Sequence, residues 1–239
     1  MKIFYDKQTI NTPNPIARFA HRNRLARVIS LIKSQVGLSK LIDYGCGSGA
    51  FIKAIQGING IAAIGYEPFM TERVDTDSPI YSDYLPVKDA APFDAITIFE
   101  AIEHLDETEL CEFLVQATEL LTDNGKILFS DPIEIGPALF LKEINRCILH
   151  KRLPENNLLE LLLASLFGVP AKRATNIKGS HKGFDFRKAI RFLEGEFGPV
   201  TIASYGPLPI GSWYGNSQVY FWLTKRSTDI GSKEAAAYA

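Results

Sequence analysis

The chain has 239 residues, of which 46% are hydrophobic and 22% charged, and its formal net charge is −1. This length suits one α/β domain with an elaboration, and the balanced charge disfavours nucleic acid as a partner. Three widely spaced cysteines without a Cys-x-x-Cys pair, no apolar N-terminal segment and no stretch long enough to cross a bilayer together predict a cytoplasmic protein without disulfides, a zinc site or a transmembrane segment.

Helices and strands are predicted to alternate along the first half of the chain. Apolar spacing indicates an amphipathic helix over 15–36. Strand, helix, strand and short strand follow at 40–44, 50–56, 61–66 and 80–83. The next strand, 93–99, is almost wholly apolar, which is typical of a strand buried on both faces.

The second half begins with Asp106-Glu107-Thr108-Glu109, a capping box that predicts the start of a helix. Asp123-Asn124-Gly125 is expected to end that helix before a strand at 126–130. Later helices are predicted at 138–150, 155–167 and 185–197, and strands at 200–204 and 218–224. Residues 1–12 and 225–239 are expected to be irregular. The alternation predicts a parallel sheet with helices on both faces.

A glycine-rich turn, Asp43-Tyr44-Gly45-Cys46-Gly47-Ser48-Gly49, follows the first strand. Glycines at the carboxyl end of a strand allow the backbone to approach a cofactor closely. Gly45-x-Gly47-x-x-Ala50 also satisfies the dinucleotide fingerprint. Asp43 argues against a dinucleotide, because its carboxylate would repel a pyrophosphate and attract the amino group of a methionine or a sulfonium.

Acidic residues follow the next strands. Glu67 lies about twenty positions after the glycine turn, where a carboxylate can accept both ribose hydroxyls of an adenosine. Asp83 could accept the adenine amino group, although a turn-forming role is equally compatible with its position. The apolar strand 93–99 ends at Glu100, with Glu103 and His104 close behind.

These motifs together closely resemble the class I S-adenosylmethionine-dependent methyltransferases, and within them the group that includes the ubiquinone and menaquinone methyltransferases. The resemblance is carried by 41–49, by Gly65-Tyr66-Glu67-Pro68 and by the segment 93–105, and it is looser over 180–225. It implies one domain over 1–239, with a Rossmann-like, seven-stranded, mostly parallel sheet, a final antiparallel strand and helices on both faces. It also implies a helical lid formed by 13–36 and by 133–180, a segment that matches nothing known to us.

The resemblance also implies a role for each motif residue. The methionine half of S-adenosylmethionine would be lined by Asp43, Gly45, Cys46, Gly47 and Gly49. Glu67 and Pro68 would hold the ribose, and Asp83 and Tyr84 the adenine. Phe99 and Glu100 would border the sulfonium and the acceptor.

His104 is the candidate catalytic base, with Glu100 beside the acceptor, because an imidazole titrates near neutral pH. His104 could instead only brace the following helix. The Glu-x-x-Glu-His spacing resembles a metal cluster of the quinone O-methyltransferases, so a divalent ion at Glu100 and Glu103 is an alternative, but we expect no metal. His181 is interpreted as structural or as a contact to the acceptor.

The predicted function is methyl transfer to a small-molecule acceptor, with oxygen favoured over nitrogen or carbon. The apolar helices of 133–180 could line a pocket for an apolar acceptor, contact a membrane, form a homodimer interface or simply pack in the core. Two alternative functions are also compatible with the sequence: an inactive module that binds S-adenosylmethionine, and a nicotinamide-dependent oxidoreductase.

Overall fold

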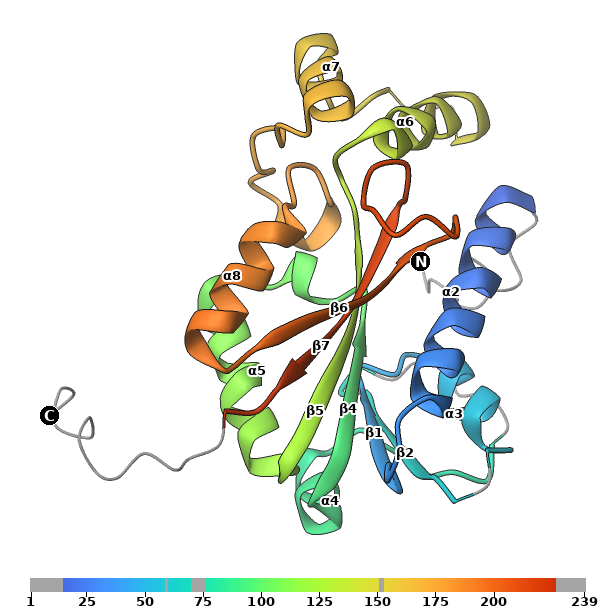
Figure 1. Cartoon of the computed structure of the whole chain (residues 1–239), viewed down its shortest axis with the longest axis vertical. Coiled ribbons are helices and arrows are strands. Elements are labelled where there is room, and N and C mark those ends of the chain that lie inside the picture. Colours follow the sequence, from blue (N-terminus) through green and yellow to red (C-terminus); the bar gives the residue numbers. More distant parts are fainter. Residues whose placement is uncertain (1–14, 59, 70–75, 151–152, 227–239) are drawn as a thin grey trace, which may run out of the picture.

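A seven-stranded sheet forms the centre of the protein, in the order β3-β2-β1-β4-β5-β7-β6 (Figure 1). The computed structural model describes residues 15–58, 60–69, 76–150 and 153–226, so the predictions for 1–14 and 227–239 lie outside the described residues. The strands are β1 (Lys40–Tyr44), β2 (Ala62–Tyr66), β3 (Ile80–Tyr81), β4 (Phe93–Phe99), β5 (Leu121–Pro132), β6 (Val200–Gly206) and β7 (Gln218–Thr224). Neighbours among β1 to β5 pair in parallel, and β7 is antiparallel to β5 and β6. The predicted mostly parallel sheet with its final antiparallel strand is confirmed.

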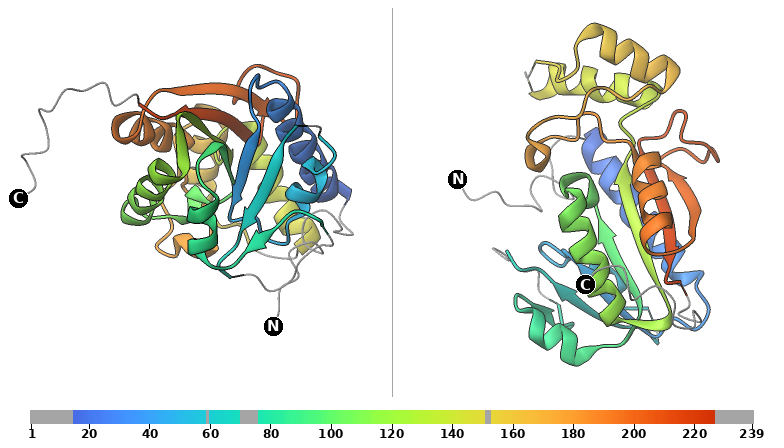
Figure 2. Two further views of the ribbon diagram at one scale, coloured as in Figure 1. Left: turned by 90° about the horizontal axis from the view of Figure 1, so that it is seen from below. Right: turned by 90° about the vertical axis from the view of Figure 1, so that its left-hand side faces the viewer.

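Helices cover both faces of this sheet, as predicted (Figure 2). On one face lie α2 (Pro15–Lys33) and α3 (Ala50–Ile55); on the other lie α4 (Tyr84–Ala90), α5 (Glu107–Leu120) and α8 (Phe186–Glu196). Successive strand residues point to opposite faces. Leu41 therefore packs with Ile52 of α3, whereas its neighbour Ile42 belongs to the core that contains Phe113 of α5 and Leu193 of α8.

The junction of α5 and β5 differs from the prediction. The capping box is present, since Glu109 N donates to Asp106 Oδ1 at 2.9 Å and Asp106 N to Glu109 Oε2 at 3.0 Å. The helix ends at Leu120, however, and β5 begins at Leu121, so the turn-forming residues 123–125 lie inside the strand. Leu121 pairs with Phe93, and the register shifts before the next pair, which accommodates the extra residues.

Helices α6 (Pro137–His150) and α7 (Leu158–Phe167) lie beyond the carboxyl ends of the parallel strands (Figure 1). They pack on each other around a small core of their own, formed by Leu139, Leu161 and Ala164. Many of their other apolar side chains are exposed, Leu158 and Phe167 among them. No helix in the described part of the chain is long and apolar enough to span a membrane.

Candidate functional site

The loop after β1 has a left-handed backbone at three positions, and each is a glycine. Gly45, Gly47 and Gly49 have φ values of 76°, 54° and 87°, in the left-handed region that favours glycine. The amides of Gly45 and Cys46 both donate to the Tyr66 carbonyl, at 2.8 and 3.0 Å. The loop is thereby fastened to the end of β2, and Gly49 becomes the N-cap of α3.

Asp43, the next-to-last residue of β1, is buried. The parallel register of β1 and β4 places Thr97 opposite Asp43, and the Thr97 hydroxyl donates to Asp43 Oδ1 at 2.7 Å. Burial raises the pKa of Asp43 from 3.8 to about 7; the Thr97 hydrogen bond opposes this shift and the charge of Glu67 adds to it. A cationic group in the adjoining cavity would favour the ionised carboxylate.

Glu67, the first residue after β2, joins two loops. Its carboxylate accepts the amide of Gly47 at 2.9 Å and that of Phe69 at 3.0 Å, whereas the neighbouring Pro68 is exposed. The approach of the two loops depends on Gly65, because a Cβ there would lie 2.7 Å from Cys46 Sγ. The carboxylate of Glu67 is therefore held against the glycine loop.

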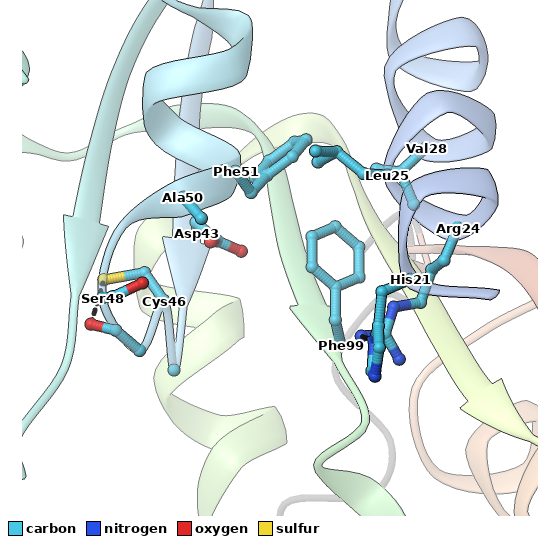
Figure 3. A pocket seen from close by; sticks show the side chains of 12 residues that line it. His21, Arg24, Leu25, Val28, Asp43, Cys46, Ser48, Ala50, Phe51 and Phe99 are labelled. Carbon is cyan, nitrogen blue, oxygen red and sulfur yellow. Dashed lines mark hydrogen bonds between the residues drawn. The ribbon is translucent and has the colours of Figure 1, made fainter. Parts of the chain in front are cut away.

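A cavity lies beside this loop, and we call it the glycine-loop cavity (Figure 3). Five of the residues predicted to bind the cofactor line it: Asp43, Gly45, Cys46, Gly47 and Phe99. Ser48, Ala50 and Phe51 complete the wall on the side of α3, and the Phe51 and Phe99 rings meet edge to face at 5.0 Å. These residues fit the methionine half of S-adenosylmethionine, since Gly45 leaves open space where a Cβ would lie and the Asp43 carboxylate suits an amino group. Glu67 lies behind the loop, on the Gly47 amide, and does not line the cavity.

The opposite wall of the glycine-loop cavity comes from α2 and was only partly predicted. It consists of His21, Arg24, Leu25 and Val28 (Figure 3). Their spacing of three, four and seven places them on one face of the helix, which was the available signal. Burial, with the nearby Arg24 charge, lowers the pKa of His21 to about 4, so its imidazole is neutral at pH 7. Arg18 and Arg22 of the same helix are exposed.

A second cavity, which we call the polar cavity, shares His21 and Arg24 with the first. Its charged lining comes from α2, the turn after β4, the segment after β5 and α6: Arg24, Glu100, Glu134, Lys142 and Arg146. His181, from the segment before α8, adds an imidazole whose pKa burial lowers to about 4. Lys142 and Glu134 form an ion pair at 2.7 Å. No apolar side chain of α6 or α7 lines this cavity. These helices line a separate pocket of their own, formed by Pro137, Phe140, Leu141, Leu162, Ser165 and Leu166. Binding of an apolar acceptor between them stays a prediction.

Glu100 sits in a sharp turn at the end of β4. It is the only non-glycine residue with positive φ among residues 15–58, 60–69, 76–150 and 153–226, at 48°. Its amide donates to the Ser130 carbonyl of β5 at 2.8 Å, and its carboxylate forms an ion pair with Arg24. The turn thus aims Glu100 at the boundary of the two cavities.

His104 lies in the short helix η1 (Ile102–His104), and both of its ring nitrogens are engaged. Nδ1 is 2.8 Å from the Ile177 carbonyl, which only accepts, so this nitrogen carries the proton. Nε2 lies 3.1 Å from Nε2 of His181, so its lone pair faces another imidazole. His181, interpreted from the sequence as structural or as an acceptor contact, is the histidine of this pair that lines the polar cavity.

The predicted adenine residues lie outside both cavity linings. Asp83 is exposed at the N-cap of α4, and its side chain makes no capping hydrogen bond. The Tyr84 ring packs 6.0 Å from that of Tyr66, on the sheet face that α5 covers. The Asp83 carboxylate therefore does not cap α4.

Solved structures share this fold. An S-adenosylmethionine-dependent methyltransferase from Archaeoglobus fulgidus has 16% identity and a TM-score of 0.54, with 85% of this chain and 94% of that chain covered. The methyltransferase domain of bacterial CtHen1 has 21% identity and a TM-score of 0.53, covering 86% and 98%. Magnesium protoporphyrin IX methyltransferase from Synechocystis PCC 6803, solved with bound SAH, has 11% identity and a TM-score of 0.53, covering 90% and 89%. None of the curated proteins matches the sequence.

A family model described as a methyltransferase domain matches residues 16–159, more than half of the chain. This match covers the glycine loop, Glu67, Glu100 and His104. It favours methyl transfer over the alternative function, that of a nicotinamide-dependent oxidoreductase. The chain belongs to this methyltransferase family and is an enzyme with a Rossmann-like fold that uses S-adenosylmethionine.

Proposed function

We propose that the enzyme methylates a hydroxyl oxygen of a small, polar acceptor bound in the polar cavity. The observation that carries the proposal is the wall of His21 and Arg24 that the two cavities share. An acceptor in one cavity is thereby adjacent to a methyl donor in the other. The charged lining, with Lys142, Arg146 and Glu134, favours an acceptor that carries polar or ionised groups.

On the cofactor side, we assign one polar group of S-adenosylmethionine to each of three carboxylates. Bound S-adenosylmethionine supplies an electrophilic methyl group on a sulfonium. Asp43 would hold the amino group, and Glu67, supported by Pro68, the ribose hydroxyls. Asp83 would accept the adenine amino group, with Tyr84 next to it. The backbone at Gly45, Cys46, Gly47 and Gly49 would surround the methionine half, since it has no bulky side chain in the way.

On the acceptor side, the chain aligns the reacting groups. Glu100 would accept a hydrogen bond from the acceptor hydroxyl and orient it, with Phe99 as the apolar border. His104 would be the base and would act through His181, which lines the polar cavity. The proton that the hydroxyl loses would pass to Nδ1 of His181, and His181 would pass its Nε2 proton to Nε2 of His104. Such alignment contributes about 7–11 kcal/mol to a displacement reaction whose leaving group is already good.

We further propose that α2 and the segment 133–180 form the lid. The helix α2 contributes a wall to both cavities, and α6 contributes Lys142, Asn145 and Arg146 to the polar cavity. Closing this lid would exclude water from the space between donor and acceptor, which strengthens every electrostatic contact inside.

The test combines binding and turnover. Calorimetry should show that S-adenosylmethionine binds and NADH does not. A panel of hydroxylated acceptors, matched in pairs with and without a carboxylate, is then assayed for transfer of a labelled methyl group. We expect the ionised members to be methylated on oxygen and Lys142→Met to weaken their binding. Methylation restricted to the apolar members, or on nitrogen or carbon, would contradict the proposal.

A further inference from the structure

The exposed apolar side chains of the protein are concentrated on two helices. Of the twenty large apolar side chains that are exposed in the described residues, eleven lie between 140 and 169. Soluble proteins rarely leave so many apolar side chains together in water, and such surfaces mark contacts with a partner or a membrane. The helices α6 and α7 carry them at one end of the molecule, beyond the carboxyl ends of the parallel strands (Figure 1).

The exposed side chains of α7 form a stripe. Two adjacent rows, each with a spacing of four residues, make up this stripe: Leu158, Leu162 and Leu166, and Leu159, Leu163 and Phe167. Residues four apart lie one above another on a helix, so the six side chains share one side of α7. The other side, with Leu161 and Ala164, packs on Leu139 of α6. The stripe is therefore additional to the apolar side that α7 needs for packing.

Helix α6 extends this surface. Phe140, Leu141 and Ile144 are 43%, 67% and 40% exposed. Phe140 and Leu141 line one groove together with Leu162 and Leu166 of α7, so the exposed side chains of the two helices adjoin. We call the nine side chains, three from α6 and six from α7, the α6–α7 apolar face.

The charges around this face are mainly positive. The sequence 137–173 contains six lysines and arginines and three glutamates, so it carries +3 in a chain whose net charge is −1. Each of the three glutamates is paired: Glu143 with Arg146 at 2.9 Å, Glu155 with Arg146 at 3.3 Å, and Glu160 with Lys182 at 2.7 Å. Lys172, which follows α7, is exposed. An anionic surface would thus be attracted to this segment.

We propose that the α6–α7 apolar face docks the enzyme on an anionic phospholipid bilayer. Helices with an apolar side and a positive surrounding lie along such a surface, with the apolar side about 5–10 Å deep at the boundary of headgroups and acyl chains. Leu141, Leu159 and Phe167, each at least 67% exposed, would enter the bilayer. This use extends the alternatives considered from the sequence, because the structure leaves the side chains exposed.

Two observations favour a bilayer over a second copy of the chain. A symmetric dimer would bring two segments of charge +3 together, because the same surface is used on both partners. A protein interface also carries about one hydrogen bond per 100–200 Å², whereas none of the nine side chains has a donor or an acceptor.

Docking would also hold part of the polar cavity. Lys142, Asn145 and Arg146 of α6 line that cavity, and Leu141 and Ile144 of the same helix belong to the apolar face. A bilayer that fixes α6 would therefore fix one wall of the cavity. This consequence rests on the proposed function, whereas docking itself does not.

The experiment measures co-sedimentation of the full chain with vesicles. We expect vesicles of equal parts phosphatidylcholine and phosphatidylglycerol to bind the protein at least about tenfold more strongly than phosphatidylcholine alone. The combined variant Leu141→Gln, Leu159→Gln and Phe167→Gln should bind the anionic vesicles at least about tenfold more weakly than wild type. The three side chains are exposed, so this variant should fold, which thermal unfolding checks.

A matched control changes apolar side chains away from these helices. Leu85→Gln on α4, Val115→Gln on α5 and Ile210→Gln after β6 alter side chains that are 68%, 62% and 48% exposed. The combined control should bind vesicles as wild type does. Insertion is tested separately with Phe167→Trp, whose emission should be quenched by phospholipids that carry bromine on their acyl chains. Leu85→Trp should not be quenched.

The proposal is overturned if wild type does not bind the anionic vesicles, or if the folded glutamine variant binds them as wild type does. A dimer in sedimentation velocity that this variant dissociates, without vesicle binding, would assign the face to a second copy and also overturn it. Methyl transfer to soluble acceptors on the same samples separates the two proposals. Transfer without vesicle binding contradicts docking alone, and vesicle binding without transfer to oxygen contradicts the proposed function alone.

Discussion

Arg24 of α2 forms an ion pair with Glu100, the residue whose left-handed backbone ends β4. Both side chains are largely buried, at 16% and 24% exposure. The contact joins a helix at the N-terminal end of the described chain to the turn that separates the two cavities. A non-glycine residue with this backbone is strained, and such strain in a turn beside two cavities marks Glu100 as a candidate functional residue.

Replacing Glu100 should separate stability from activity. Glu100→Gly and Glu100→Gln both remove the charge, but only glycine adopts a φ of 48° without strain. We expect the glycine variant to be more stable than the glutamine variant by about 0.5–1 kcal/mol. Urea unfolding of the two proteins measures the difference, and both should lose methyl transfer. A glutamine variant of equal or greater stability would show that the turn is unstrained.

Glu67→Gln should weaken cofactor binding. A carboxylate that accepts hydrogen bonds contributes about 1.5–3 kcal/mol per bond, so we expect the affinity for S-adenosylmethionine to fall at least about tenfold. Calorimetry measures it, and Glu112→Gln, an exposed glutamate on α5, is the control. Unchanged affinity would remove Glu67 from the site.

Asp43→Asn should stabilise the protein at neutral pH while weakening cofactor binding. The pKa of Asp43 is about 7 in the folded protein and ordinary when unfolded, so between these values the unfolded chain binds fewer protons. The Asp43 contribution to stability therefore falls as pH rises from about 4 to 7, and is level above. The Asp43→Asn variant avoids this loss of stability, which is at most about 4 kcal/mol. Its side-chain oxygen can still accept the hydrogen bond from the Thr97 hydroxyl.

Urea unfolding of both proteins near about pH 5 and about pH 8 checks the sign. The advantage of Asp43→Asn should grow with pH, and the raised pKa of Glu103, present in both proteins, cancels in the difference. An advantage that shrinks as pH rises would mean that Asp43 is stabilised as the anion.

Gly65→Ala should destabilise the fold through one contact. The new Cβ would lie 2.7 Å from Cys46 Sγ and 3.2 Å from Ile80 Cγ1, a degree of overpacking that costs about 1–3 kcal/mol. Adding Cys46→Ala should restore part of that loss. Gly57→Ala, which meets no atom within 4 Å, is the control. Equal unfolding midpoints for the two alanine variants would contradict the predicted clash.

Deleting 138–167 should leave the body of the enzyme folded. The helices α6 and α7 have their own small core, and the flanking residues lie against one ring, since Cβ atoms at Gly136 and Gly168 would lie 3.1 and 2.8 Å from Trp213. A short glycine linker can therefore rejoin the chain. We expect binding of S-adenosylmethionine to persist and turnover to disappear. Loss of folding would show that the segment is part of the core and not a lid.

Local signals predicted most elements of the fold. The apolar run of β4 and the capping box before α5 are confirmed because each depends on residues close in sequence. The α5–β5 junction was wrong because pairing of Leu121 with Phe93 outweighs the turn chemistry of 123–125. The helix α4 was not predicted, and it begins directly after Asp83.

The site was predictable only where one motif contains it. The glycine loop and Phe99 line one cavity as expected, whereas the wall from α2 depends on how a helix packs across the sheet. The pairing of His104 with His181 joins residues 77 positions apart, and no local pattern encodes that distance. The burial that leaves both carboxylate oxygens of Glu103 without a hydrogen bond is likewise a property of the folded chain.

The ring of Trp213 lies between the two ends of the segment that carries α6 and α7, and the Arg187 guanidinium stands 5.7 Å over it. The chain has only one other tryptophan, Trp222, which is buried within β7. The enzyme therefore contains its own optical reporter. With Trp222 replaced by phenylalanine, the emission of Trp213 would follow, in real time and without a label, each movement of these helices relative to the sheet.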